Sequence, residues 1–137
     1  MTMTCAELEE LLARGFPDLD MQRYAVEEAT DDSVRVRLSV GKRDVRPGGT
    51  LLGPTLMEMA DIAAYLCVLA PGDAGMLAVT TNLNIHFLRK PKIEDVLAVG
   101  RTLKRGRRLC VVEVTMSTVG DRAPIAHATI SYALPSS

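Results

Sequence analysis

Hydrophobic residues are densest between positions 46 and 70, where the chain reads RPGGTLLGPTLMEMADIAAYLCVLA. Good helix formers run from Pro54 to Ala70 with no internal glycine or proline, which predicts a helix. Pro54 suits the first helical position, and Thr50 and Gly53 are the candidates for its N-cap. Apolar residues occupy all sides of this helix, which is typical of a buried helix. Its length of about 17 residues and its two acids favour a core helix over a membrane span.

Alternating apolar and polar residues predict strands on both sides of this helix. The expected strands are residues 24–29, 34–40, 77–89, 95–104, 109–118 and 125–134. In the segment 77–89, one face carries Val79, Thr81, Leu83, Ile85 and Phe87, and the other carries Ala78, Thr80, Asn82, Asn84 and His86. Thr4 and Glu7 have the spacing of a capping box, which predicts a short first helix ending at Gly15. We expect the loop 16–21 to cover part of a cleft.

These elements predict an α+β fold in which an antiparallel sheet wraps around one long central helix. The 137 residues fit a single domain that spans 1–137. Apolar residues make up 47% of the chain, but it holds only three Tyr, two Phe and no Trp, so the core must be aliphatic. A sheet that covers one helix leaves its outer face and its edges exposed, which predicts a homo-oligomer.

Charge and cysteine usage narrow the classes of partner. A net charge of −1 argues against a nucleic-acid surface and against membrane binding. Cys5, Cys67 and Cys110 lack the spacing of metal or redox motifs, and an odd count without a secretory signal predicts a reducing, cytoplasmic location. His86 and His127 have no further ligands in a suitable pattern, so no metal site is expected.

The two acids are the exception on the apolar helix. Glu58 and Asp61 are three residues apart, and Tyr65 follows Asp61 by four, so one narrow stripe holds every strongly polar group. An ionised carboxylate is costly to bury unless it is paired or used. The stripe therefore either faces solvent or lies in a cleft near the helix N-terminus, where free N–H groups favour a developing oxyanion.

Three segments carry a resemblance to a known family. They are Gly49-Thr50-x-x-Gly53 with Asp61 eight residues after Gly53, AVTTNLNIHFLRKP at 78–91, and LKRGRRLCVVEVTM at 103–116 followed by AHATISYAL. In this order they resemble the hotdog-fold acyl-CoA thioesterases of the phenylacetic-acid-pathway (PaaI-like) type, over roughly residues 35–134. The resemblance implies a homodimer or dimer of dimers that hydrolyses short- or medium-chain or aryl acyl-CoA to the free acid and CoA. It implies no cofactor other than coenzyme A as part of the substrate.

The same resemblance implies catalytic roles for three residues. Asp61 matches the acid that activates water or attacks the thioester carbonyl, and the choice between these two mechanisms stays open. Gly53 matches the glycine whose backbone N–H polarises that carbonyl. Thr80 matches the Ser or Thr that helps to hold the water from the neighbouring subunit. A base on one side of the carbonyl and fixed donors on its oxygen are what thioester hydrolysis requires.

Two departures from the family pattern favour an alternative function. Leu52-Gly53-Pro54 stands where the family has His-Gly-Gly, and Arg46 stands where it has a helper Asn or Gln. Leu52 has no side-chain donor and Pro54 has no N–H, so the oxyanion site would rest on Gly53 and helix amides. The alternative is a non-catalytic acyl-CoA-binding or regulatory protein with the same fold. A hotdog dehydratase is disfavoured, because the chain lacks a His and acid pair in the arrangement that hydration requires.

Basic residues in two segments form the candidate seat for the phosphates of coenzyme A, because Arg and Lys bind phosphate well. They are Arg89, Lys90, Lys104, Arg105, Arg107 and Arg108, and Asn82 is assigned with them as a substrate-binding residue. The alternative for the basic residues is a solvated turn, and for Asn82 it is strand pairing. Glu58 remains an alternative base.

Overall fold

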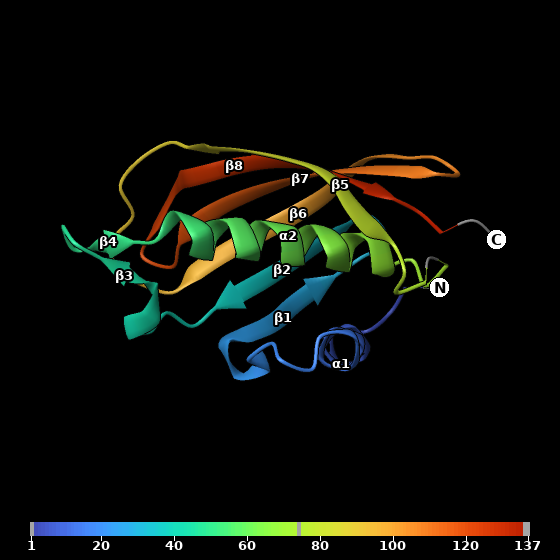
Figure 1. Cartoon of the computed structure of the whole chain (residues 1–137), viewed down its shortest axis with the longest axis horizontal. Helices are drawn as coiled ribbons and strands as arrows, with labels where there is room; N and C mark the ends of the chain where they lie inside the picture. Colours follow the sequence, from blue (N-terminus) through green and yellow to red (C-terminus); the bar gives the residue numbers. More distant parts are fainter. Residues whose placement is uncertain (1, 74, 136–137) are drawn as a thin grey trace.

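The computed structural model describes residues 2–73 and 75–135 and contains two α-helices and one large sheet within them (Figure 1). The helical elements are α1 (Cys5–Gly15), η1 (Met21–Arg23), η2 (Lys42–Asp44) and α2 (Gly53–Leu69). The strands are β1 (Tyr24–Ala29), β2 (Ser33–Leu38), β3 (Val45–Arg46), β4 (Thr50–Leu51), β5 (Val79–Phe87), β6 (Val96–Arg105), β7 (Leu109–Thr118) and β8 (Asp121–Ala133). The predicted domain of 1–137 also includes residues 1, 74, 136 and 137, which lie outside the described residues.

The large sheet has the strand order β1-β2-β6-β7-β8-β5, and every neighbouring pair in it is antiparallel. It curls around α2, as Figure 1 shows, while β3 and β4 form a separate small hairpin beside the start of α2. This arrangement confirms the predicted α+β hotdog fold. The strands β1 and β5 lie at the two edges of the sheet, so each leaves one row of backbone groups unpaired within the described chain.

The first helix begins as its sequence predicts. The Thr4 side chain accepts a hydrogen bond from the Glu7 backbone N–H at 3.1 Å, and the Glu7 carboxylate accepts one from the Thr4 N–H at 2.9 Å. This reciprocal pair is a capping box. Leu8 and Leu12 are buried on the helix face that contacts the rest of the molecule. The helix therefore packs as an amphipathic element beside β1.

The start of α2 differs from the prediction. The N-cap residue is Leu52, and its side chain makes no capping hydrogen bond, so neither Thr50 nor Gly53 is the N-cap. Pro54 lies in the first turn as expected. With no polar side chain at the N-cap, the beginning of this helix must be fixed by contacts with another segment.

Those contacts come from Asp44, which is fully buried. Its backbone oxygen accepts the Leu52 N–H at 2.7 Å, and its carboxylate accepts hydrogen bonds from the Thr55 hydroxyl at 2.9 Å and the Gly41 N–H at 2.9 Å. Arg23 completes the set with an ion pair to the same carboxylate. Burial alone would raise the pKa of Asp44, but the donors from Gly41, Thr55 and Arg23 hold it below its ordinary value. Asp44 thus anchors the N-terminal end of α2.

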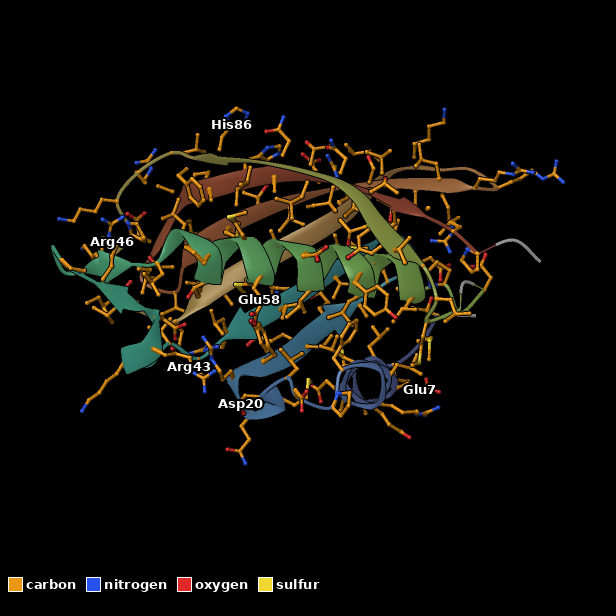
Figure 2. The ribbon with its side chains drawn as sticks, in the orientation of Figure 1. Glu7, Asp20, Arg43, Arg46, Glu58 and His86 are labelled. Atoms are coloured by element: carbon orange, nitrogen blue, oxygen red, sulfur yellow. The ribbon has the colours of Figure 1, made fainter. Side chains whose placement is uncertain are left out.

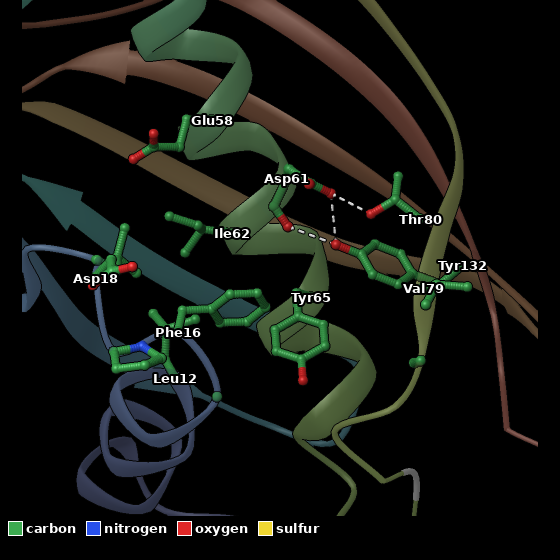
Figure 3. A pocket seen from close by; sticks show the side chains of 14 residues that line it. Leu12, Phe16, Asp18, Glu58, Asp61, Ile62, Tyr65, Val79, Thr80 and Tyr132 are labelled. Carbon is green, nitrogen blue, oxygen red and sulfur yellow. Dashed lines mark hydrogen bonds between the residues drawn. The ribbon is translucent and has the colours of Figure 1, made fainter.

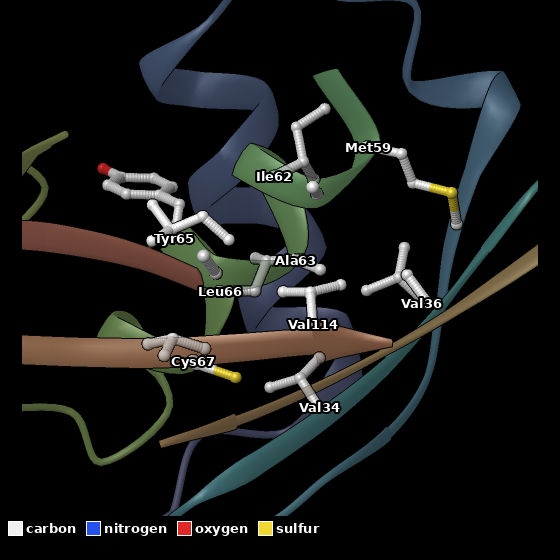
Figure 4. Packing of buried hydrophobic residues seen from close by; sticks show 14 of the residues in the cluster. Val34, Val36, Met59, Ile62, Ala63, Tyr65, Leu66, Cys67 and Val114 are labelled. Atoms are coloured by element: carbon white, nitrogen blue, oxygen red, sulfur yellow. The ribbon is translucent and has the colours of Figure 1, made fainter. Parts of the chain in front are cut away.

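The core is aliphatic and lies between α2 and the concave face of the sheet. From Met59 to Leu69 the helix is buried on all sides except at Asp61. Figure 4 shows Met59 and Ala63 on the side of Val36 in β2 and Val114 in β7. The prediction of a helix that is buried all round is therefore confirmed for 59–69 apart from the partly exposed Asp61, whereas Pro54, Met57 and Glu58 nearer the start of α2 are exposed.

Helix α2 and the sheet approach each other closely at Gly100 of β6. A Cβ atom at this position would lie 2.8 Å from the Cys67 sulfur and 3.2 Å from the Ala63 carbonyl oxygen. Burial raises the pKa of Cys67 to about 12, so its thiol stays protonated and acts as an apolar group. Cys110 is buried as well. Both cysteines fill the core.

The edge strand β5 contains a β-bulge that the sequence did not reveal. Thr80 pairs with Tyr132 of β8, but the next pair along the ladder is Asn82 with Ser131, which leaves Thr81 as the extra residue. A bulge of this kind shifts the alternation of side chains by one position.

The bulge changes which residues of β5 share a face. Thr80 contacts α2, and Leu83 and Ile85 pack against the core on the same side of the sheet. Uninterrupted alternation had placed Thr80 on the face opposite Leu83 and Ile85, and this was wrong. Asn82 lies on the outer face with His86, which points away from α2 (Figure 2).

No helix within residues 2–73 and 75–135 has the length and apolar character needed to cross a membrane.

Candidate active site

A pocket of about 680 Å³ opens beside the middle of α2 (Figure 3). One wall is α2 itself, with Glu58, Asp61, Ile62 and Tyr65. The end of α1 and residues 16–19 form the opposite wall, while the start of β5 and Tyr132 of β8 close a third side. The expectation that the loop after α1 covers part of a cleft is confirmed for 16–19.

Asp61 is held in this pocket by two hydroxyl groups. Its Oδ1 atom accepts a hydrogen bond from the Thr80 hydroxyl at 2.9 Å and one from the Tyr132 hydroxyl at 2.6 Å (Figure 3). The Tyr132 hydroxyl also lies 3.0 Å from the Asp61 backbone oxygen. The other carboxylate oxygen, Oδ2, accepts no hydrogen bond from the described residues. The carboxylate is therefore fixed through one oxygen and free at the other.

The structure brings Thr80 and Asp61 together within one chain. The resemblance implied that Thr80 acts from the neighbouring subunit, and the 2.9 Å contact corrects this, because both residues belong to the same subunit. The reason is the bulge at Thr81, which turns Thr80 toward α2.

Tyr132 is the site residue that the sequence analysis missed. Its side chain is buried, and the pKa of its hydroxyl is raised, first by burial and then by the hydrogen bond to Asp61. The sequence could have shown that Tyr132 is buried, since strand alternation places it on the same face as the buried Ala128 and Ile130. A buried tyrosine hydroxyl needs a partner, but only the folded chain shows that the partner is Asp61.

Glu58 has a separate hydroxyl partner. Figure 2 shows it pointing from α2 toward β1, where the Tyr24 hydroxyl donates a hydrogen bond to Glu58 Oε1 at 2.6 Å. The pKa of Tyr24 is raised by burial and by this hydrogen bond. Together with Asp61 and Tyr65, Glu58 lines the pocket, so the polar stripe of α2 faces a cleft instead of open solvent.

Aromatic and aliphatic side chains form the rest of the pocket. The Phe16 ring meets the Tyr65 ring edge to face, with 5.6 Å between centroids, and the Tyr65 and Tyr132 centroids are 5.9 Å apart. Leu12 and Ile62 complete the apolar wall. An apolar chamber beside a fixed carboxylate suits a ligand with a hydrophobic group next to a polar reacting centre.

Gly53 lies outside this pocket. It precedes Asp61 by eight residues on α2, which corresponds to about 12 Å along the helix axis. A Cβ atom at Gly53 would instead lie 3.6 Å from the ring of Phe87, at the far end of β5. Within one chain, the Gly53 N–H and the Asp61 carboxylate therefore cannot contact the same carbonyl group, and the interpretation that places Asp61 near the helix N-terminus is corrected.

The basic residues fall into two groups at opposite ends of the molecule. Arg89 and Lys90 follow the end of β5, where Phe87 pairs with Ala126 of β8. Lys104, Arg105, Arg107 and Arg108 belong to the β6–β7 hairpin, where Leu109 pairs with Ala133 of β8. Those two positions on β8 are seven residues apart, or about 23 Å along the strand. Within one chain, the six basic residues therefore cannot form a single binding site for the phosphates of coenzyme A.

Arg105 and Asn82, two of the residues predicted to bind the substrate, do not face the pocket. Arg105 donates hydrogen bonds to the Val68 carbonyl at 3.1 Å and to Asp73 at 2.6 Å. It therefore stabilises the C-terminal end of α2, where carbonyl groups lack helical partners. Asn82 faces outward beside Ser131, on the side of β5 away from the pocket.

No group of three or more His, Cys, Asp or Glu side chains is placed to hold a metal ion among the residues that the structure describes.

Comparison with known proteins gives three relevant findings. The family model described as Thioesterase superfamily matches residues 48–125. A candidate thioesterase from Silicibacter sp. TM1040 is 35% identical, with a TM-score of 0.88, over 97% of this chain and 92% of that chain. No curated protein sequence matches the chain.

More distant solved structures have the same fold. Thioesterase superfamily member 2 from zebra fish is 21% identical, with a TM-score of 0.84, over 98% of this chain and 100% of that chain. A hypothetical thioesterase protein from Streptococcus pneumoniae TIGR4, solved with coenzyme A, is 21% identical, with a TM-score of 0.77, over 97% of this chain and 98% of that chain.

Proposed function

The chain belongs to the thioesterase superfamily, whose reaction is the hydrolysis of thioesters, and we propose that it acts on acyl-CoA with a short- or medium-chain or aryl acyl group. We place it with the PaaI-like members. The observation that carries this proposal is Asp61, an acid in the wall of an apolar pocket, fixed through Oδ1 by Thr80 and Tyr132.

In the proposed reaction Asp61 is the general base. Its free Oδ2 atom takes a proton from a water molecule while the water oxygen attacks the thioester carbonyl carbon. The carbonyl electrons move onto oxygen and form a tetrahedral oxyanion. When this intermediate collapses, the C–S bond breaks and the coenzyme A sulfur receives the proton from Asp61. The products are the free acid and the thiol, and Asp61 is again ionised.

The hydroxyl groups of Thr80 and Tyr132 already donate to the Asp61 carboxylate, so the oxyanion needs other donors. Antiparallel pairing of β5 with its copy across a two-fold axis would set the Phe87 end of one strand beside the Val79 end of the other. Val79 and Phe87 are 58% and 51% exposed on this edge strand, which supports such an interface. Gly53 lies against Phe87, so the pairing brings the N–H of Gly53 of the partner subunit to the Asp61 pocket. We propose a homodimer as the catalytic unit, which associates further into a dimer of dimers.

The same dimer supports a composite seat for coenzyme A. Arg89 and Lys90 lie at the Phe87 end of β5, and the β6–β7 hairpin lies at the Val79 end. Strand pairing between two copies brings these ends together. We propose that Arg89, Lys90 and the hairpin of the partner subunit bind the phosphates of the substrate. Arg105 has no part in this, because it is bound to the end of α2.

A specific observation favours a second candidate function, the binding of acyl-CoA without turnover. Leu52 caps α2 with no side-chain hydrogen bond, and Pro54 follows with no N–H, so the helix start offers fewer donors than a His-Gly-Gly segment would. In that case the protein would be an acyl-CoA receptor, and its pocket would bind acyl-CoA without hydrolysing it.

Thiol release from acetyl-, hexanoyl-, decanoyl- and benzoyl-CoA tests the proposal. We expect turnover by the wild type and a loss of about 100- to 10,000-fold with Asp61→Asn, which keeps the shape of the side chain and removes the base. Glu58→Gln removes an equal charge from the same wall and should keep most of the turnover. Tight binding of intact acyl-CoA with no thiol release would establish the receptor, and turnover lost only with Glu58→Gln would assign the base to Glu58.

A further inference from the structure

We propose that Tyr132 is a positioning residue for hydrolysis, which holds Asp61 in the orientation that directs Oδ2 at the attacking water. This inference rests on the proposed role of Asp61 as base. It extends that role to a residue on the last strand, 71 positions further along the chain.

The Tyr132 hydroxyl makes a three-centre contact with Asp61. It lies 2.6 Å from the side-chain Oδ1 and 3.0 Å from the backbone oxygen of the same residue. A contact to the backbone alone would satisfy the buried hydroxyl, yet the shorter distance is to the carboxylate. Because both contacts involve one residue, they fix the Asp61 side chain relative to its own backbone and restrict its rotation.

Tyr132 is itself held firmly. Its strand, β8, is paired on both sides, with Thr80 of β5 and Cys110 of β7 opposite Tyr132. The tyrosine is only 3% exposed. A donor whose own position is fixed by packing and strand pairing can keep a helix side chain in one orientation.

The hydroxyl is a donor at every pH at which the enzyme would work. Burial and the neighbouring carboxylate raise the pKa of Tyr132, so the phenol stays protonated. The other titratable groups that line the pocket with Asp61 are Glu58 and Tyr65 of α2 and Asp18 of the loop after α1. None of these makes a hydrogen bond to the Asp61 carboxylate in the described chain, whereas Thr80 and Tyr132 both do.

The chain provides a matched control in Tyr24. This second tyrosine is 4% exposed, and its hydroxyl donates to a carboxylate of the same helix at the same 2.6 Å distance, but the acid is Glu58. Tyr132→Phe and Tyr24→Phe thus remove equivalent hydroxyl groups from the two acids of the stripe. Both substitutions keep the ring and its packing.

The test measures kcat, KM and the pH profile of both variants with hexanoyl-CoA and benzoyl-CoA. We expect Tyr132→Phe to lower kcat about 10- to 100-fold, the effect of losing a hydrogen bond to a charged group, with little change in KM. The acid limb of its profile should move to higher pH, because the ionised Asp61 loses a donor that stabilises it. Tyr24→Phe should retain the wild-type kcat and profile.

Wild-type kcat and an unmoved acid limb in a folded Tyr132→Phe would overturn the inference, and so would equal losses in the two variants. Asp61→Asn in the same assay distinguishes a failure of the positioning role of Tyr132 from a failure of the proposed role of Asp61 as base. If Asp61→Asn is inactive while Tyr132→Phe is not, only the positioning role fails, and if Asp61→Asn is fully active, both fail.

Should Tyr132→Phe fail to fold, 3-fluorotyrosine at position 132 gives the same information. It keeps the hydroxyl and makes it a stronger donor, so the acid limb should move to lower pH, and an unmoved limb would refute the role.

Discussion

At the scale of single residues, Asp44 is a fully buried charged side chain outside the pocket. Asp44→Ala would leave the guanidinium of Arg23, which is only 14% exposed, without its partner and would free the Thr55 hydroxyl. We expect the free energy of unfolding to fall by about 3–5 kcal/mol, as for other buried pairs that lose one member. Glu10→Ala, which removes an exposed ion pair with Arg14, should cost about 0.5 kcal/mol or less. Chemical denaturation of both variants measures the difference.

The same residue makes a testable contribution to acid stability. The folded state holds the pKa of Asp44 below its ordinary value of 3.8, so Asp44 adds stability above that value and loses the contribution as the pH falls through the folded-state pKa. The stability difference between wild type and Asp44→Ala should therefore shrink as the pH is lowered from about 5 to about 2. A difference that stays constant over this range would contradict the assignment of the ionised form.

Residues of the site differ in how far the sequence could identify them. Acids on an apolar helix are conspicuous, which pointed to both Glu58 and Asp61, and the spacing of Asp61 from Gly53, which resembles a family motif, singled out Asp61. Tyr132 was not identified, and neither was Asp44 outside the site, because their roles depend on partners that are distant in the chain, such as Asp61 for Tyr132 and Arg23 for Asp44. Local pattern shows that a polar group is buried but does not show which group it meets.

At the scale of elements, the close contact between α2 and the sheet at Gly100 gives a further prediction. Gly100→Ala would place a methyl group 2.8 Å from the Cys67 sulfur and 3.2 Å from the Ala63 carbonyl oxygen. We expect a loss of about 1–3 kcal/mol in unfolding free energy, because β6 must move away from α2. Thermal and urea unfolding would measure it.

Two further variants examine the cause of that loss. Gly41→Ala is the control, because Gly41 has a φ of −132° and no atom within 4 Å of the added Cβ, so it should be nearly neutral. Adding Cys67→Ala to Gly100→Ala removes the nearest atom and should recover part of the stability relative to Cys67→Ala alone. No recovery would mean that the carbonyl of Ala63 is the controlling contact.

Several element boundaries were predicted well, although β8 begins at Asp121, four residues before the predicted start of the last strand. The strands 24–29 and 109–118 were predicted with the bounds that the structure shows, and the central helix was displaced by one residue. The face assignment in β5 failed at Thr81, because a single extra residue in a strand leaves no mark in composition or hydrophobicity. That failure mattered for function, since it decided which face Thr80 occupies.

At the scale of the whole molecule, the proposed dimer can be tested by complementation. Asp61→Asn and Gly53→Pro, which removes the N–H of residue 53, should each be nearly inactive alone. In a mixed dimer, one of the two sites would combine an intact Asp61 with the intact N–H of Gly53 of the partner subunit. After random exchange of subunits, roughly half of the dimers are mixed, so about a quarter of the wild-type activity should return.

Analytical ultracentrifugation before and after mixing confirms that subunits exchange. If no activity returns although mixed dimers form, then Asp61 and Gly53 do not act across the interface, and the composite site is wrong.

The overall architecture was predictable only in outline. A long helix that is apolar all round, followed by four alternating segments, indicated a sheet wrapped around a helix. The strand order was not predictable, because alternation shows which face of a strand is buried but not which strand lies beside it. In this chain β2 pairs with β6, so Ser33 meets Arg101, which lies 68 positions further along the sequence.

The central place of α2 in the chain also has a consequence for biosynthesis. A ribosome that has released residues up to 95 has produced the whole of this apolar helix, but β2 then lacks its neighbour β6, and β5 lacks β8. The helix cannot be covered until the last strands emerge, because the sheet closes only through pairings that are remote in sequence. The nascent chain therefore presents a long hydrophobic surface from the completion of α2 until the last strands emerge, and it depends on chaperones or rapid completion to avoid aggregation.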